Sequence, residues 1–179
     1  TGRSRNDQVL TAIRLFTKEN LIQIEEELLG LITVLLKFAE AQKENLMPGY
    51  THMQKAMPST FGMWASALAE GLFDDLVLLK AAYGLNDQSP LGSAAAYGVP
   101  LPLNREYTAA LLGFEKVQIN SLYAQNSRGK IEAAVLAALV AILTDVNKLA
   151  SDVLLFTTSE FNFLKVSDSL TSGSSIMPQ

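Results

Sequence analysis

The sequence predicts an all-α protein, a bundle of long helices, on the basis of three observations. Hydrophobic residues recur at alternating steps of three and four along three long stretches, which is the heptad spacing of helices packed side by side. No stretch alternates apolar and polar residues with the period of two that is typical of a strand. Proline and glycine gather between the three stretches. We therefore expect three long rods joined by short helices and polar loops.

The first rod is predicted from Val9 to Ala41. At 1.5 Å per residue this tract is about 50 Å long, more than a small compact domain needs. Pro48 and Gly49 then mark the break before the next element. The apolar seam of the tract is formed by Leu21, Ile24, Leu28, Leu31, Leu35 and Phe38.

The second rod is predicted from Ser59 to Tyr83, with Ser59 or Thr60 as its cap and Gly84 as its C-terminal stop. Trp64 begins its apolar face, which we interpret as core rather than as a cofactor site. The other members of that face are Leu68, Leu72, Leu76 and Leu79.

The third rod is predicted to begin at Ile131. It is apolar nearly all round between Ala133 and Leu143, which indicates a helix buried inside a bundle. Its seam comprises Val135, Leu139, Ile142, Val146, Leu149, Val153 and Phe156.

The segment between the second and third rods is predicted to be mostly irregular. Three prolines and two glycines exclude a long helix over residues 86–103. Residues 89–94 are small and uncharged, which fits either packing against a site or a neighbouring chain, or ordinary loop packing. Asn104 is expected to cap a short helix that ends near Gly113.

The composition favours an oligomeric helical protein. Hydrophobic residues make up 49% of the 179 residues and charged residues only 18%, so more apolar surface is expected than one chain can bury. The net charge of -4 offers no basic stripe for nucleic acid. With no cysteine there is no disulfide or thiolate metal site, which fits a reducing compartment. The longest strongly apolar run, Ala133 to Leu143, is shorter than a bilayer requires.

The polar residues at the start of the chain allow two interpretations. Asn6 or Asp7 could cap the first helix by accepting hydrogen bonds from its free N–H groups. Alternatively Ser4, Arg5 and Asn6 could bind an anion, because arginine presents a donor fork to carboxylates and a helix N-terminus carries partial positive charge. The spacing alone does not separate these readings.

Two further polar phrases stand apart from the rods. His52, the only histidine, is expected in a short loop with Thr51 and Gln54 beside it, either as a structural residue or as a proton-transfer group. Residues 173–179, Gly-Ser-Ser-Ile-Met-Pro-Gln, would suit a mobile linker or a functional loop.

Together the phrases resemble the signature regions of the fumarase/aspartase superfamily of lyases, and most closely its argininosuccinate lyase family. That family's pattern is Thr-Gly-Arg-Ser-Arg-Asn-Asp-Gln, Gly-Tyr-Thr-His-x-Gln, Pro-Leu-Gly-Ser and Gly-Ser-Ser-x-Met-Pro-Gln, which is matched at residues 1–8, 49–54, 90–93 and 173–179. Lys55 stands where fumarases and aspartases carry an acidic residue. The resemblance covers residues 1–179 as the central helical domain of a longer enzyme, with its N-terminal and C-terminal domains outside the chain.

The resemblance implies elimination of fumarate from argininosuccinate, leaving arginine, without cofactor or metal. It assigns His52 and Ser174 as the acid/base pair, and we favour Ser174 as the base. Asn6 and Thr51 would hold the substrate, and Ser4, Arg5 and Gln54 would line the same site.

The resemblance also implies a cytoplasmic homotetramer that acts in arginine biosynthesis, with each active site shared between subunits. The alternatives are a sister fumarate-releasing lyase and a non-catalytic crystallin-like protein. The sequence departs from the family at residues 125–128, where Gln-Asn-Ser-Arg replaces the usual Ser-Asp-Arg-Asp. The Lys and Asn expected after Gln179 lie beyond the chain.

Overall fold

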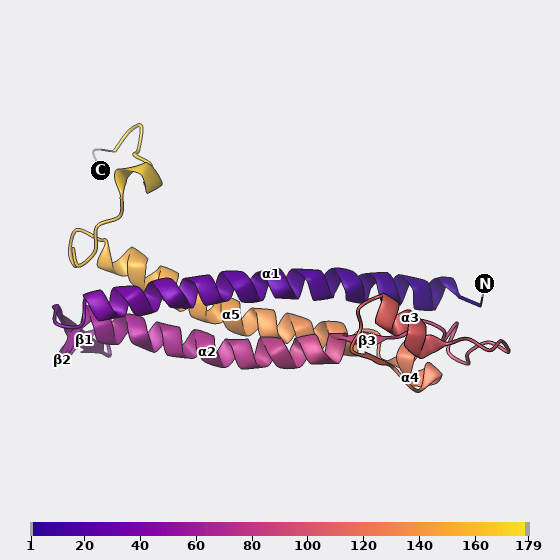
Figure 1. Cartoon of the computed structure of the whole chain (residues 1–179). Helices are drawn as coiled ribbons and strands as arrows, with labels where there is room; N and C mark the ends of the chain where they lie inside the picture. The colour runs from indigo at the N-terminus through magenta and orange to yellow at the C-terminus, as the bar shows by residue number, and fades with distance from the viewer. Residues whose placement is uncertain (1, 178–179) are drawn as a thin grey trace.

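A computed structural model describes residues 2–177 and confirms the all-α class. Its three long helices are α1 (Arg5–Ala41), α2 (Phe61–Asn86) and α5 (Lys130–Phe156), which lie side by side as rods (Figure 1). The helix α2 packs along both α1 and α5. The predicted seams form the core between them, in which the buried side chains include Leu21, Leu28, Leu35, Leu72, Leu76, Leu79, Val135 and Ile142.

The helix α1 begins four residues earlier than expected, and its cap is neither Asn6 nor Asp7. Ser4 is the N-cap, and its hydroxyl oxygen accepts the Asn6 N–H at 3.2 Å. Asp7 instead closes a capping box by accepting the backbone N–H of Ser4 at 2.8 Å. The three predicted anion-binding residues therefore form the cap and first turn of the helix.

The prediction that Gly84 ends the second rod is wrong, because α2 continues to Asn86. A tertiary contact holds this last turn, because the Asn86 side chain donates to the Arg14 carbonyl at 2.8 Å. The Asp87 N–H donates to the Tyr83 carbonyl as an ordinary helical hydrogen bond. At the other end of α2, Thr60 is the cap, one of the two predicted candidates, and accepts from Met63.

The loop predicted around His52 is instead an antiparallel β-hairpin of β1 (Leu46–Thr51) and β2 (Gln54–Thr60). His52 and Met53 form its two-residue turn with φ of 52° and 62°, the left-handed geometry that suits the twist of a hairpin. Asparagine and glycine usually mark such turns, so the sequence carried no turn signal. Pro48 and Pro58 lie opposite each other, and neither can donate a ladder hydrogen bond.

The far end of the rods carries the short elements: β3 (Gln88–Ser89), α3 (Arg105–Leu111), β4 (Lys116–Val117) and α4 (Ser121–Asn126) (Figure 1). β3 and β4 pair in parallel. Asn104 caps α3 as predicted, by accepting from Tyr107 at 2.9 Å. After α5 the chain leaves the hairpin end of the rods through a single 3₁₀ turn, Asp168–Leu170.

The helix α5 is not enclosed by the rest of the chain. Leu136, Val140 and Leu143 are each at least 60% exposed, although this stretch was expected to be buried inside a bundle. By length and composition alone, α5 could cross a membrane, although the strongly apolar run 133–143 within it is shorter than a bilayer requires. Among the described residues, this face of α5 is left uncovered.

Candidate active site

The hairpin brings three of the predicted site residues together at one tip. Thr51 and Gln54 are paired across the strands, and His52 occupies the turn between them. All three side chains are exposed, so a substrate could reach them. The backbone at His52 is left-handed, with φ of 52°.

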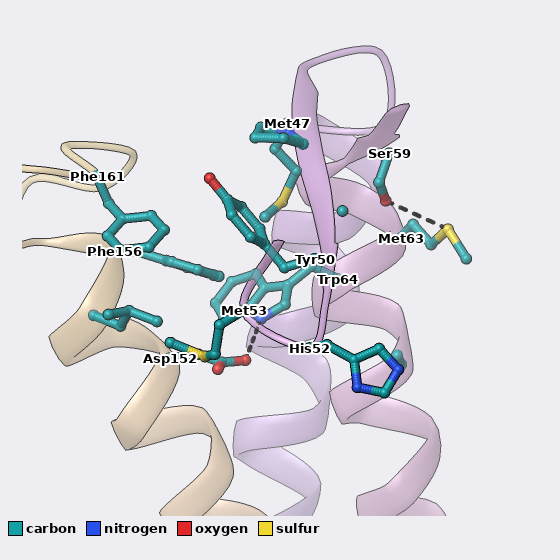
Figure 2. Close-up of a pocket in the computed structure, with 14 residues that line it drawn as sticks. Met47, Tyr50, His52, Met53, Ser59, Met63, Trp64, Asp152, Phe156 and Phe161 are labelled. Carbon is teal, nitrogen blue, oxygen red and sulfur yellow. Dashed lines mark hydrogen bonds between the residues drawn. The ribbon is translucent and has the colours of Figure 1, made fainter. Parts of the chain in front are cut away.

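A cavity of about 500 Å³ lies beneath the hairpin, between it and the ends of α2 and α5. Tyr50, Phe156 and Phe161 contribute aromatic rings to it, with ring centroids 5.5 to 6.3 Å apart. The Trp64 indole N–H donates to the Asp152 carboxylate at 2.8 Å on its wall. Figure 2 shows the His52 ring pointing away from these aromatic side chains.

Trp64 was interpreted as core, and it is half-buried in this wall rather than enclosed in the seam. Asp152 was not singled out by the sequence, since a single aspartate on a helix carries no signal of its own. Its partner lies 88 residues away, so only the packed helices reveal the pair.

The second group of predicted residues, Ser4, Arg5 and Asn6, lies at the opposite end of the rods (Figure 1). Arg5 and Asn6 are exposed, and Ser4 is half-buried as the cap. An anion placed here would meet the arginine fork, the asparagine amide and the partial positive charge of the helix N-terminus. The geometry therefore allows both predicted roles, cap and anion site, at the same turn.

Ser174 lies in the exposed C-terminal segment, at the hairpin end. Its hydroxyl oxygen accepts the backbone N–H groups of Ile176 and Met177, at 3.2 and 3.0 Å. Of the signature phrase, Pro178 and Gln179 fall outside the described residues.

One chain does not unite the predicted groups. The helix α1 has 37 residues, which span about 55 Å at 1.5 Å per residue. Asn6 lies in its first turn and His52 in the hairpin that follows its last turn, so the two cannot contact one substrate molecule within one chain. Any site that uses both must draw them from different chains.

Comparison with known proteins defines the class of this molecule. The family described as Lyase matches the chain over residues 1–179, and the chain belongs to this lyase family.

Within that family the chain is similar to argininosuccinate lyases. It is 49% identical over 178 residues to the argininosuccinate lyase of Parabacteroides distasonis and to that of Thermotoga neapolitana, covering 99% of this chain in each case. It spans 40% and 45% of the length of these relatives.

Solved structures confirm the fold. The crystal structure of EDDS lyase in complex with formate superposes on this chain with a TM-score of 0.96 and is 32% identical to it in sequence. The match covers 99% of this chain and 36% of the EDDS lyase chain. A fumarate lyase:delta crystallin from Brucella melitensis shares 26% identity with a TM-score of 0.80, over 98% of this chain and 40% of that one.

Proposed function

We propose that this chain is the central helical domain of an argininosuccinate lyase, which splits argininosuccinate into arginine and fumarate in the cytoplasm. The observation that carries the proposal is the 49% identity with argininosuccinate lyases across 178 residues. The chemistry follows from what the polar phrases can do.

In the proposed reaction, Ser174 removes a proton from the carbon next to a carboxylate, and the resulting intermediate carries extra charge on that carboxylate. His52 then gives a proton to the departing guanidino nitrogen. The two N–H groups that hydrogen-bond the Ser174 oxygen support the role of base, because such donors stabilise a serine alkoxide.

Asn6 and Thr51 hold the carboxylate on which negative charge grows, with Ser4, Arg5 and Gln54 around it. Donors aimed at developing charge stabilise the transition state more than the bound substrate. The position of Asn6 in an exposed first helical turn supports this, since the helix N-terminus adds partial positive charge there.

We further propose a homotetramer with active sites shared between subunits. Two features support it: the span of α1 between Asn6 and His52, and the exposed apolar face of α5. Other copies of the chain, rather than lipid, would then cover that face.

The test uses the full-length protein that contains this chain, with release of fumarate followed by absorbance. We expect His52→Asn and Ser174→Ala each to lower turnover about 100-fold or more, the usual worth of a general acid or base. Asparagine is chosen at position 52 because it tolerates a positive φ. Ser175→Ala and Lys55→Gln serve as neighbouring controls, and losses as large as those of the test variants would contradict the assignment.

Mixing the two inactive variants tests the shared site. Exchanged tetramers of His52→Asn and Ser174→Ala chains should contain some sites with both residues intact, so activity should return. No return of activity, once exchange is demonstrated by a mass-tagged subunit, would show that both residues come from one chain.

The second candidate is a sister lyase of the same family that acts on another substrate. The likeness to EDDS lyase makes EDDS the substrate to test first. Turnover of EDDS without turnover of argininosuccinate would select that candidate. Turnover of neither, in a folded full-length protein, would select a non-catalytic crystallin-like role.

A further inference from the structure

Asp7 has more hydrogen bonds than a helix cap requires. Its side chain is fully buried in the first turn of α1, directly after Asn6. One carboxylate oxygen, Oδ1, closes the capping box with Ser4. The other, Oδ2, accepts two backbone N–H groups from a distant loop, that of Gly92 at 3.0 Å and that of Ala94 at 2.9 Å.

The segment that supplies these donors, residues 90–94, is held in an unusual backbone conformation. Gly92 has φ of +88° and Ala94 has φ of +51°, a region that alanine rarely adopts. Two amides that converge on one point form a cradle for an anion. Because Ala94 is buried, its N–H would cost free energy if it lost its partner, and the Asp7 carboxylate is that partner.

Arg105 holds the same loop from the other side. Its guanidinium donates to the carbonyls of Leu91 and Gln118, each at 2.9 Å. It lies so close to Gly92 that a Cβ atom there would meet the arginine side chain at 2.9 Å. The loop is therefore clamped between a carboxylate on α1 and a guanidinium on α3.

We infer that Asp7 is a positioning residue for the reaction: it ties the first turn of α1 to the 90–94 loop and so orients Asn6. Its own carboxylate is buried and does not reach the substrate. Loss of the tie would remove the two hydrogen bonds between this turn and the 90–94 loop. A displacement of about 1 Å at a substrate-binding group can cost about 100-fold in rate. The inference rests on the proposed function, in which Asn6 binds the substrate carboxylate.

The experiment compares Asp7→Asn with Asp87→Asn in the full-length enzyme. Asp87 is a matched control, because it is another buried carboxylate at the same end, accepting from Lys18 and from the Glu115 N–H. We expect Asp7→Asn to lower kcat/KM at least tenfold, while Asp87→Asn stays within about twofold once the two are compared at equal folded fraction. Equal losses in both variants would overturn the inference.

A second readout separates positioning from simple support of the fold. If Asp7 acts through Asn6, the double variant Asn6→Ala, Asp7→Asn should be no slower than Asn6→Ala alone. Multiplied losses would overturn the inference while leaving the role of Asn6 intact. An Asn6→Ala variant with unchanged kcat/KM would overturn both the substrate-binding role of Asn6 and the inference.

A third readout does not depend on activity. Amide hydrogen exchange in residues 90–96 should quicken in Asp7→Asn and stay unchanged in Asp87→Asn, and unchanged exchange in both would contradict the tie. If Asp7→Asn does not fold, Asp7→Glu keeps the charge but displaces it by one methylene. The Asp7→Glu variant should then show faster amide exchange in residues 90–96 and a smaller loss of kcat/KM than expected for Asp7→Asn. Wild-type kinetics in Asp7→Glu would contradict the inference.

Discussion

Buried charged side chains in this chain bind segments that are far apart in sequence. Arg14 is only 1% exposed, and its guanidinium donates to the Gln88 carbonyl at 2.6 Å and to the Ser127 hydroxyl at 3.0 Å. Burial lowers the pKa of Arg14, and Glu132 opposes that shift. These hydrogen bonds join the N-terminal third of α1 to the short elements at that end of the rods.

Asp75 is a buried charge of the opposite kind, since one of its carboxylate oxygens has no hydrogen-bond partner among the described residues. Burial raises the pKa of Asp75 above its ordinary 3.8, and the neighbouring Asp145 raises it further. The folded chain therefore binds this proton more tightly than the unfolded chain. Its contribution to stability is greatest below about pH 4 and declines as pH rises through the folded pKa.

We therefore expect Asp75→Asn to stabilise the protein at pH 7. Tm should rise by a few degrees, the usual size of a change of about 1 kcal/mol in a chain of this length. The gain should shrink as pH falls toward 4, when the wild-type carboxyl also becomes neutral. Thermal unfolding of both proteins across that range is the measurement, with Glu26→Gln, at an exposed position of α1, as the control. A gain that did not depend on pH would contradict this account.

At the scale of the elements, two glycines of α2 occupy opposite environments. A Cβ atom on Gly62 would lie 2.7 Å from the Ala39 carbonyl oxygen and 2.7 Å from the Lys43 Cα, so glycine permits the close approach of α1 and α2. A Cβ atom on Gly84 would meet nothing within 4 Å. Both residues are helical, so the intrinsic preference for alanine is the same at the two positions.

We expect the two alanine substitutions to have opposite signs. Gly62→Ala should destabilise the chain by about 1–3 kcal/mol through overpacking against rigid backbone. Gly84→Ala should stabilise it by about 0.5–1 kcal/mol, the usual difference in helix propensity. Denaturant unfolding of both variants measures the two changes, and a shared sign would show that packing at Gly62 does not decide its identity.

The β-hairpin shows how an element can appear without a local signal. Its strands carry two prolines and an exposed turn of His52 and Met53, none of which favours a hairpin by itself. What stabilises it is contact with the rest of the fold: Tyr50 packs on Phe161 and Phe163, and Met47 is buried. These contacts hold the strands in place, and the strands position the His52–Met53 turn.

At the scale of the whole molecule, the three long helices bury one set of apolar residues between them and leave another set exposed. Between α1 and α5 runs an open groove of about 530 Å³, lined by Ile24, Leu28 and Val146 among others. On α5, the apolar residues Leu136, Val140 and Leu143 are exposed as well. Exposed apolar residues on the rods support the proposed assembly, because large apolar patches on a protein surface usually mark an interface.

We expect Leu143→Lys to weaken that assembly. Leu143 is 64% exposed in the middle of α5, so its substitution costs the single chain little but would place a charge inside a helical interface. Light scattering of the full-length protein should show a smaller species than wild type. Leu170→Lys is the control, because Leu170 is 79% exposed in the C-terminal segment away from the rods. A tetramer unaffected by Leu143→Lys would place the interface elsewhere.

The sequence by itself determined the three rods, the cap of α3 and the polar phrases, and it narrowed the cap of α2 to Ser59 or Thr60. Helical hydrogen bonds join residues four apart, so the neighbours that decide a helix are present in the local pattern, as in the seam from Leu21 to Phe38. The same locality allowed Asn104 and Thr60 to be proposed as caps.

Only the tertiary structure decided the hairpin, the extension of α2 past Gly84, the partners of Asp7 and the separation of Asn6 from His52. Each depends on residues distant in sequence: strands on their pairing, the last turn of α2 on Arg14, and Asp7 on amides 85 and 87 residues away. A pattern of neighbours contains no information about such contacts, because the chain must first pack its rods before these groups can meet.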